Sequence, residues 1–172
     1  MEDKMSLVDE TPIESRRSPI SFKGKVCIEL RGPDGEVKDT RKMSNVVVDL
    51  GEQYIVDVWH AHETSTPIVT RMIAMKLGTD NTPANDADTD LGSYISGSSK
   101  LLTSITQTTP WTLRWITTWI SGSLANIEEI GIFDNDTDAT GGLMLARAIV
   151  SPPITATMPP DTITATWDIF LG

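Results

Sequence analysis

The sequence has a single cysteine and two histidines, and these shortages restrict the chemistry that it can carry. Cys27 has no second cysteine with which to form a disulfide within the chain. Zinc catalysis needs at least three suitable protein ligands, and no CxxC or HExxH motif supplies them. The sequence also has no GxSxG nucleophile elbow, Walker lysine loop or GxGxxG spacing. These absences disfavour an enzyme, and we expect no cofactor and no bound metal.

Positive charge and long apolar runs are also scarce. The chain carries 14 Lys and Arg against 24 Asp and Glu, for a net charge of −10. Non-specific nucleic-acid binding depends on Lys and Arg that displace counterions from phosphates, so nucleic acid is not an expected partner. No run of about 18 apolar residues predicts a membrane span. No basic, then apolar, then small-residue leader opens the chain, so a signal peptide is not expected.

The sequence is instead rich in β-branched residues and in turn formers, with ten prolines and twelve glycines in 172 residues. This composition predicts a mainly β fold of many short strands. The length suits one domain. We therefore expect a compact antiparallel β-sandwich or barrel-like domain over residues 20–172. One short α-helix and an extended N-terminal arm over residues 1–19 complete the prediction.

Turn signals and apolar periodicity place the expected elements along the chain. Pro33-Asp34-Gly35 predicts a tight turn between two hairpin strands. Apolar residues at helical spacing predict a helix over residues 49–60. The further strands are expected in these segments: IVTRMIAMKL (68–77), SKLLTSITQ, the stretch 111–120, ANIEEIGIF, LMLARAIV and TITATWDIFL.

Three of the five tryptophans stand at four-residue spacing in WTLRWITTW. Spacing alone fits a helix face or a strand face, but the β-branched neighbours favour a strand. Alternation then puts Trp111, Trp115 and Trp119 on one face. We expect this face to be core or subunit interface, and an open stacking platform for a glycan is the alternative.

The first 19 residues are polar, charged and punctuated by proline. They contain too few apolar groups to offset the entropy of ordering on their own. Our hypothesis is that this arm packs against a neighbouring subunit. The arm residues expected to contact the partner are Ile13, Arg16, Arg17 and Ile20.

Two aspartate clusters suggest a calcium site, because carboxylates stand at alternate positions in each. The clusters are Asp86, Asp88 and Asp90, and Asp134, Asp136 and Asp138. Neither continues with the glycine and glutamate that an EF-hand loop requires at its sixth and twelfth positions. We interpret both as polar turns. The adjacent Glu128 and Glu129 are expected to point to opposite faces of a strand, so they do not form an acid/base pair.

Several segments occur in a suggestive order: NVVVDLGEQYIVDV, MKLGTDNTPANDADTDL, ANIEEIGIF, GGLMLARAIVSPPIT and TITATWDIF. This order resembles a family of small structural proteins of tailed bacteriophages, and the likeness spans roughly residues 20–172. The matched positions are Asn45, Gly51, Leu77, Gly78, Thr79, Asn126, Glu129, Ile130, Gly131, Phe133, Arg147 and Trp167. The sequence departs from the family pattern at Asp80, Ile132 and Ala156.

The resemblance implies a non-enzymatic virion protein, assembled in the bacterial host cytoplasm. We favour a head-surface decoration or cement protein that forms a homo-oligomer, with a trimer as the preferred state. Its implied partners are further copies of itself and the major capsid protein or the tail and collar proteins of the same virion. The alternatives are a collar, baseplate or tail-fibre-associated protein, or a carbohydrate-binding module that uses the tryptophan face.

Overall fold

A computed structural model describes residues 22–64, 71–120, 124, 126–155 and 159–171 of the chain. The expected arm, with Ile13, Arg16, Arg17 and Ile20, lies outside these residues. The elements are β1 (Phe22–Arg31), β2 (Val37–Val47), α1 (Asp49–Thr64), β3 (Ala74–Gly78), β4 (Lys100–Leu101), β5 (Ser104–Thr109), β6 (Thr112–Ile120), β7 (Ile127–Phe133), β8 (Met144–Ile154) and β9 (Thr162–Leu171).

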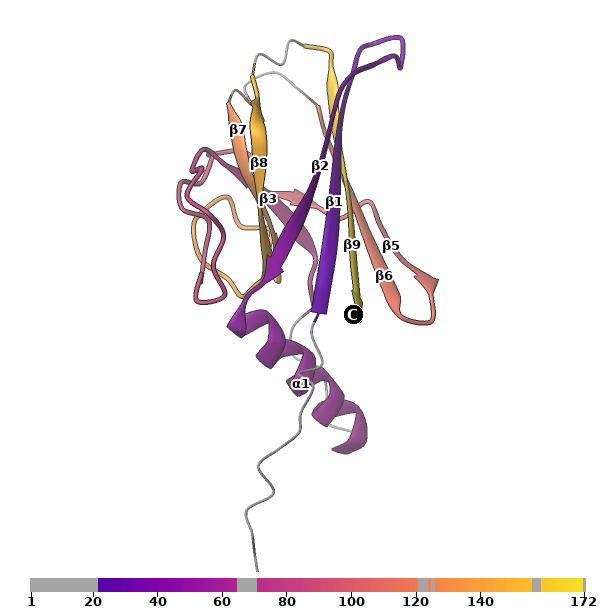
Figure 1. The fold of residues 1–172 in the computed structure, drawn as a ribbon, viewed down its shortest axis with the longest axis vertical. Helices are drawn as coiled ribbons and strands as arrows, with labels where there is room; N and C mark the ends of the chain where they lie inside the picture. Colours follow the sequence, from indigo (N-terminus) through magenta and orange to yellow (C-terminus); the bar gives the residue numbers. More distant parts are fainter. Residues whose placement is uncertain (1–21, 65–70, 121–123, 125, 156–158, 172) are drawn as a thin grey trace, which may run out of the picture.

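All nine strands belong to one antiparallel sheet, in the order β4-β3-β7-β8-β2-β1-β9-β6-β5. The sheet curls so that its two halves face each other (Figure 1). The strand β2 joins the halves, because its first part pairs with β1 while Val46 and Val47 pair with β8. The expected mainly β fold with one helix is therefore confirmed, in the form of a curled half-barrel.

The hairpin of β1 and β2 forms as the turn residues predict. The amide of Gly35 donates to the carbonyl of Gly32 at 3.0 Å, and Gly35 has a φ of 85°, a region that glycine enters without steric cost. From the turn β2 runs back along β1, and β1 pairs with β9 on its other edge. Its alternating residues Val26, Ile28 and Leu30 are buried between the two halves of the sheet.

The core fills the space between the two halves. One half supplies inward side chains from β1, β6 and β9, and the other supplies them from β3, β7 and β8. A smaller apolar cluster lies on the other face of β7 and β8 and consists of Val48, Leu91, Phe133 and Met144. The second half of the sheet is therefore covered on both of its faces.

The helix α1 begins at Asp49, as expected, but continues to Thr64 rather than ending near residue 60. It lies across the end of the curled sheet where β2 finishes and β1 starts (Figure 1). None of the helices that the structure describes is long and apolar enough to cross a membrane.

Two strand predictions need correction. The sequence predicts one strand over the segment 68–77, but β3 starts only at Ala74, and residues 71–73 are not in a strand. Residues 68–70 lie outside the described part of the chain. The segment SKLLTSITQ forms two strands, because the chain leaves β4 at Leu101 and enters β5 at Ser104. Between them the amide of Leu102 donates to the carbonyl of Ile73, and the amide of Thr103 donates to that of Ile116. The chain thus crosses from one end of the sheet to the other, and periodicity gives no signal of such a crossing.

Candidate interaction site

Arg147 on β8 is the centre of a buried charge cluster. Its guanidinium donates to Glu129 at 2.8 Å, to Asp88 at 2.8 Å and to Asp80 at 3.2 Å. The side chain of Arg147 is 3% exposed and that of Glu129 is fully buried. Burial acts to lower the pKa of Arg147, but the hydrogen bonds that its guanidinium donates to Asp88 and Glu129 outweigh it and raise the pKa. The arginine therefore stays charged.

Glu129 on β7 binds two parts of the loop between β3 and β4, near its start and about two thirds of the way along it. Its carboxylate accepts the amide of Ser93 at 2.8 Å, that of Gly92 at 3.0 Å and that of Asp80 at 3.3 Å. A carboxylate that receives three amides and a guanidinium has its lone pairs satisfied. Glu128 is half-buried and bonds Asn126 instead, so the two glutamates point apart as expected.

Gly78 and Gly131 leave the space that this cluster needs. A Cβ on Gly78 would lie 2.2 Å from a carboxylate oxygen of Glu129 and 2.5 Å from the carbonyl of Ser93. A Cβ on Gly131 would lie 2.7 Å from the ring of Phe133 on the same strand and 3.1 Å from the side chain of Leu91 in the loop. Both glycines therefore allow a close approach of the loop to the sheet.

The loop between β7 and β8 is organised by a second buried cation, Lys76. Its ammonium donates to Asn135 at 2.8 Å and to the carbonyls of Ala139 at 3.0 Å and Gly141 at 3.1 Å. It also lies 4.6 Å from the centre of the Phe133 ring, which is a favourable cation–π distance. Burial lowers the pKa of Lys76, and Asp90 is the first of several aspartates that oppose this change.

The two Asp-rich loops also contact each other. Asp138 accepts hydrogen bonds from the Tyr94 hydroxyl and from the amide of Gly97, and Asp90 accepts one from the amide of Gly141 at 2.5 Å. The hydrogen bonds from Tyr94 and Gly97 lower the pKa of Asp138. Hydrogen bonds from the amide and hydroxyl of Thr82 likewise lower the pKa of Asp80. The loops form one layer over the outer face of β3, β7 and β8.

In this layer the side-chain cations of Lys76 and Arg147 occupy the centres of the Asp-rich loops, the positions at which the aspartate clusters suggest a calcium ion. Lys76 and Arg147 are each surrounded by oxygen atoms of the loops, which are the ligands that Ca²⁺ would otherwise recruit. No group of three or more metal-ligating side chains suited to a metal ion occurs among the described residues. The turn interpretation of both aspartate clusters fits these contacts.

Four further motif positions have a structural explanation in close packing or in backbone conformation. A Cβ on Gly51 would lie 2.1 Å from the carbonyl oxygen of Leu145, so the start of α1 touches the backbone of β8. Asn45 lies against Gly24 in the neighbouring strand. Asn126 has a φ of 59°, a left-handed conformation that asparagine tolerates better than most residues. Trp167 on β9 is fully buried.

The tryptophan row is divided by burial. Trp115 is 6% exposed and Trp119 is 3% exposed, and both belong to the core. Trp119 also donates its indole N–H to the carbonyl of Ser98 at 2.7 Å. Trp111, in contrast, precedes β6 and is 68% exposed. Core placement therefore holds for Trp115 and Trp119, and Trp111 departs from it because the turn between β5 and β6 carries it beyond the sheet.

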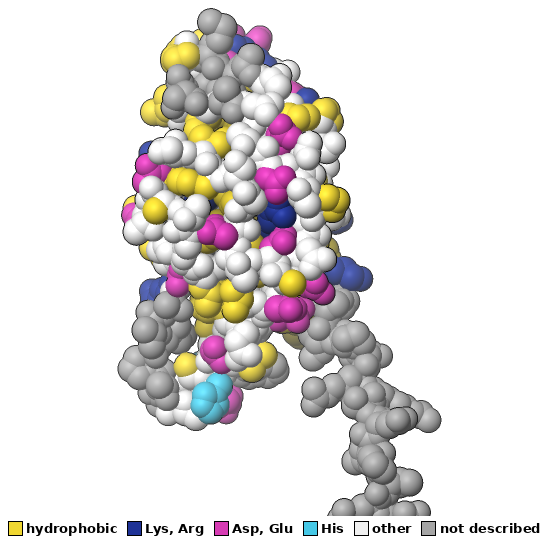
Figure 2. Space-filling model, turned by 90° about the vertical axis from the view of Figure 1, so that its left-hand side faces the viewer, with side chains coloured by type: hydrophobic (Ala, Val, Ile, Leu, Met, Phe, Trp, Pro, Cys, Tyr) yellow, Lys and Arg dark blue, Asp and Glu magenta, His cyan; other side chains and the backbone are white. Residues whose placement is uncertain are grey.

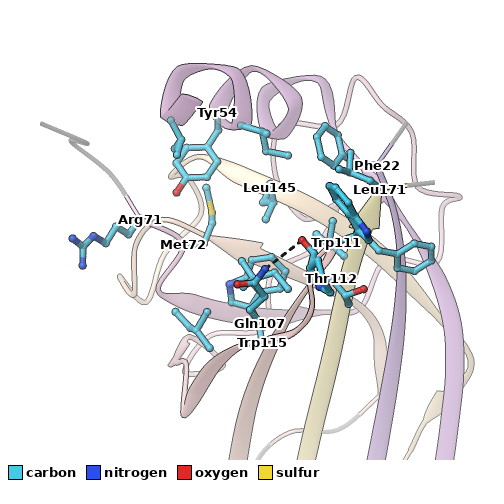
Figure 3. Close-up of a pocket in the computed structure, with 17 residues that line it drawn as sticks. Phe22, Tyr54, Arg71, Met72, Gln107, Trp111, Thr112, Trp115, Leu145 and Leu171 are labelled. Atoms are coloured by element: carbon cyan, nitrogen blue, oxygen red, sulfur yellow. Dashed lines mark hydrogen bonds between the residues drawn. The ribbon is translucent and has the colours of Figure 1, made fainter. Parts of the chain in front are cut away.

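Trp111 stands beside an open apolar pocket of about 520 Å³ at the end of the sheet. In Figure 3 the helix α1 closes one side, Phe22 and Leu171 lie beside Trp111, and Tyr54 and Met72 lie across the cavity. Trp115 and Leu145 form part of the lining. The pocket thus joins α1, the ends of β1 and β9, and the hairpin of β5 and β6.

The chemistry of this pocket is that of an apolar contact site. The few polar groups in its lining include Gln107, which bonds the carbonyl of Pro110, and Arg71, whose side chain points away from the cavity in Figure 3. The hydroxyl of Tyr54 is half-buried, and burial raises its pKa. A lining with so few free polar groups suits apolar side chains of another protein better than a sugar, whose hydroxyls need donors and acceptors.

Sequence reasoning missed the pocket and Lys76. The pocket residues come from segments far apart in the chain, and only the curl of the sheet unites them. Lys76 stands in the apolar run IAMKLG, and an isolated lysine within a buried strand is a usable signal, because buried lysines require a partner. The two histidines and the cysteine weighed as zinc ligands come from separate elements, because His60 and His62 lie in α1 and Cys27 lies on β1.

Comparison with known proteins adds no relative. No protein-family model, no curated protein and no solved structure matches the chain.

Proposed function

We propose that this chain is a non-enzymatic structural component of a tailed-phage virion, and specifically a head-surface decoration or cement protein that acts as a homo-oligomer. The proposal starts from the order of sequence segments that resembles such proteins. The observation that carries it further is the spatial convergence of those segments.

Several of the residues selected only by their order in the sequence lie together in the fold, whereas Trp167 lies on β9 in the other half of the sheet. Gly78, Glu129, Gly131 and Arg147 come from three strands and meet in the buried charge cluster and its immediate surroundings. Gly51 packs on the same strand, β8, that carries Arg147. Convergence of this kind is expected when the motifs belong to one fold pattern and not when they match by chance. It supports a shared architecture with the virion family.

The motif residues have roles in packing rather than in catalysis. Arg147 and Glu129 satisfy each other and the loop amides, so neither offers a free group to a substrate. The apolar pocket beside Trp111 is a suitable contact surface for another virion protein. Both features favour a binding role over an enzymatic one.

Binding to phage particles tests the proposal. Purified protein would be mixed with heads that lack decoration and, separately, with tails, and the bound protein would be counted per particle after sedimentation. We expect saturable binding to heads in a fixed ratio. Saturable binding to tails alone would favour the collar, baseplate or tail-fibre alternative, and binding to neither would contradict a virion role.

A glycan-binding module is the second class to be separated. Trp111 is the one exposed member of the tryptophan row and so the member able to stack on a sugar. A glycan array probed with the wild type and with Trp111→Ala would show binding lost in the variant if the alternative holds. We expect no glycan signal, because the pocket beside Trp111 presents few free polar groups.

A further inference from the structure

The charges of this acidic protein are segregated between two opposite sides of the molecule. The outer face of β2, β1, β9 and β6, which we call the basic face, has more cations than carboxylates. Its cations are Lys23, Lys25, Arg31, Lys38, Lys42 and Arg114, and its carboxylates are Glu29 and Asp168. The excess of positive charge is unexpected in a chain with a net charge of −10.

Three of these cations are exposed and have no carboxylate partner among the described residues, although Lys25 also lies 5.9 Å from the centre of the Phe170 ring. Arg31 pairs with Glu29, Arg114 pairs with Asp168, and Lys38 pairs with Asp161 beside the face. The exposed residues Lys23, Lys25 and Lys42 form no ion pair with any residue that the structure describes.

The centre of the basic face is hollowed. A depression of about 410 Å³ is lined by Lys25, Lys42, Arg114 and Asp168, with the half-buried Cys27 among them. Lys25 and Lys42 come from the paired strands β1 and β2, where Lys25 lies opposite Ser44 and Lys42 lies opposite Cys27, so the two lysines are diagonal neighbours on one face. Such a shape can receive a protruding acidic segment.

The opposite side of the molecule carries the layer of Asp-rich loops. Figure 2 views the molecule from this side, and acidic side chains are spread over it. Asp86 and Asp136 are exposed there, and neither takes part in the bonds to Arg147 or Lys76 that hold the loops. Glu129 and Arg147 point toward the loops while Ile130 points into the core, so the loop layer covers the outer face of one half of the sheet. The basic face is the outer face of the other half, on the far side of the core.

We propose that the basic face docks the Asp-rich loop layer of a second copy of this chain. The contact is heterologous, since two different surfaces meet, and repetition of it builds a closed ring if the rotation between copies closes. Charge complementarity selects this partner over others, because the same chain supplies both signs on opposite sides. The inference rests on the proposed homo-oligomer but not on its location in a virion.

Charge reversal on each surface tests the contact in the full-length chain. One variant carries Lys25→Glu and Lys42→Glu, and the other carries Asp86→Lys and Asp136→Lys. We expect each alone to raise the dissociation constant of the oligomer more than about tenfold, because like charges then face each other. Light scattering after size exclusion, under reducing conditions, gives the mass. Raising the salt from about 0.05 to 0.5 M should weaken the wild-type oligomer as well.

Mixing the two reversed variants separates this contact from misfolding. We expect the mixture to associate, because each variant keeps one surface that fits an unchanged surface of the other. The controls Glu63→Lys, near the end of α1, and Lys100→Glu, on β4, alter exposed charges outside both surfaces and should leave association unchanged.

The inference is overturned if the wild type is a monomer at millimolar concentration, if the reversed variants assemble like the wild type, or if their mixture stays monomeric. It is also overturned if the basic face instead binds inorganic phosphate or nucleic acid and the copies do not associate. Head binding is measured separately, so a failure of the virion proposal leaves these results interpretable.

Discussion

At the scale of single residues, burial separates side chains that the sequence pattern groups together. Trp111, Trp115 and Trp119 share their spacing and their face by alternation, yet Trp111 is exposed and the other two are not. The same distinction applies to the aspartates, since Asp88 bonds Arg147 while Asp136 faces solvent. What a residue does here depends on its surroundings more than on its motif.

The tryptophan pair Trp111 and Trp115 gives a matched stability test. Trp115→Ala should lower the free energy of unfolding by about 3–5 kcal/mol, because it removes a buried ring and leaves a cavity. Trp111→Ala should change it by no more than about 0.5 kcal/mol, because the ring is largely in solvent. Urea unfolding followed by circular dichroism measures both, and similar losses in the two variants would contradict the assigned burial.

Removal of Arg147 should be costly because its partners remain. Arg147→Met leaves Glu129 charged and buried without its guanidinium, and breaking a buried pair in this way costs about 3–5 kcal/mol. The double variant Arg147→Met with Glu129→Gln should recover part of the loss, because the uncompensated charge is then gone. A double-mutant cycle in urea measures the coupling, and strictly additive effects would argue against the pair.

At the scale of elements, a close backbone contact positions the helix α1 on the sheet, and two buried cations position the Asp-rich loops. The helix α1 touches β8 through Gly51, and the Asp-rich loops are fixed to the sheet by Lys76 and Arg147. These contacts join segments far apart in the chain. Each can be disturbed separately.

Gly51→Ala should act against its usual helix propensity. An alanine in place of a helical glycine normally stabilises a helix by about 1 kcal/mol. Here the added Cβ would meet the carbonyl oxygen of Leu145, which is backbone and cannot rotate away. We expect a loss of about 1–3 kcal/mol in thermal unfolding, with Glu52→Ala as the exposed control on the same helix. A higher melting temperature for Gly51→Ala would contradict the close approach.

The Asp-rich loops should loosen in acid. The folded pKa values of Asp80 and Asp138 are lowered, so their contribution to stability is present above the unfolded value of about 3.9 and is lost as the pH falls through that value toward the folded pKa. Amide protection factors at Thr82 and Gly97, measured by hydrogen exchange near pH 6 and pH 3, should fall. Asp138→Asn should remove the change at Gly97 and leave that at Thr82 in place. Equal protection at both pH values would contradict this account.

At the scale of the whole molecule, the two halves of one curled sheet have different outer surfaces, and the end of the sheet carries a third. The acidic loop layer, the basic face and the apolar pocket beside Trp111 lie in different places, so several contacts can be made at once. This arrangement suits a subunit that contacts both its copies and a particle. The separation of the acidic and basic surfaces is the basis of the proposed contact between copies.

Calcium should leave the stability of the wild type unchanged. Lys76 and Arg147 already supply positive charge at the centres of both loops, so the oxygen atoms around them have partners. The melting temperature with about 5 mM CaCl₂ should equal that with a chelator. In Arg147→Ala the carboxylates of Asp80, Asp88 and Glu129 lose their cation, and any calcium-dependent rise should appear in this variant. A rise in the wild type that Asp86→Ala or Asp136→Ala abolishes would reopen a metal site.

The sequence by itself determined the mainly β class, the hairpin turn at Gly35, the start of the helix at Asp49 and the strand that holds Trp115 and Trp119. These features depend on local propensity and on periods of two or 3.6 residues, which neighbouring residues establish. Only the tertiary structure decided which tryptophans are buried, where the chain crosses from β4 to β5, and that Lys76 and Arg147 hold the loops. It also separated the acidic and basic surfaces. Those features depend on contacts between distant segments, because the register and curl of the sheet bring together residues that no local pattern relates.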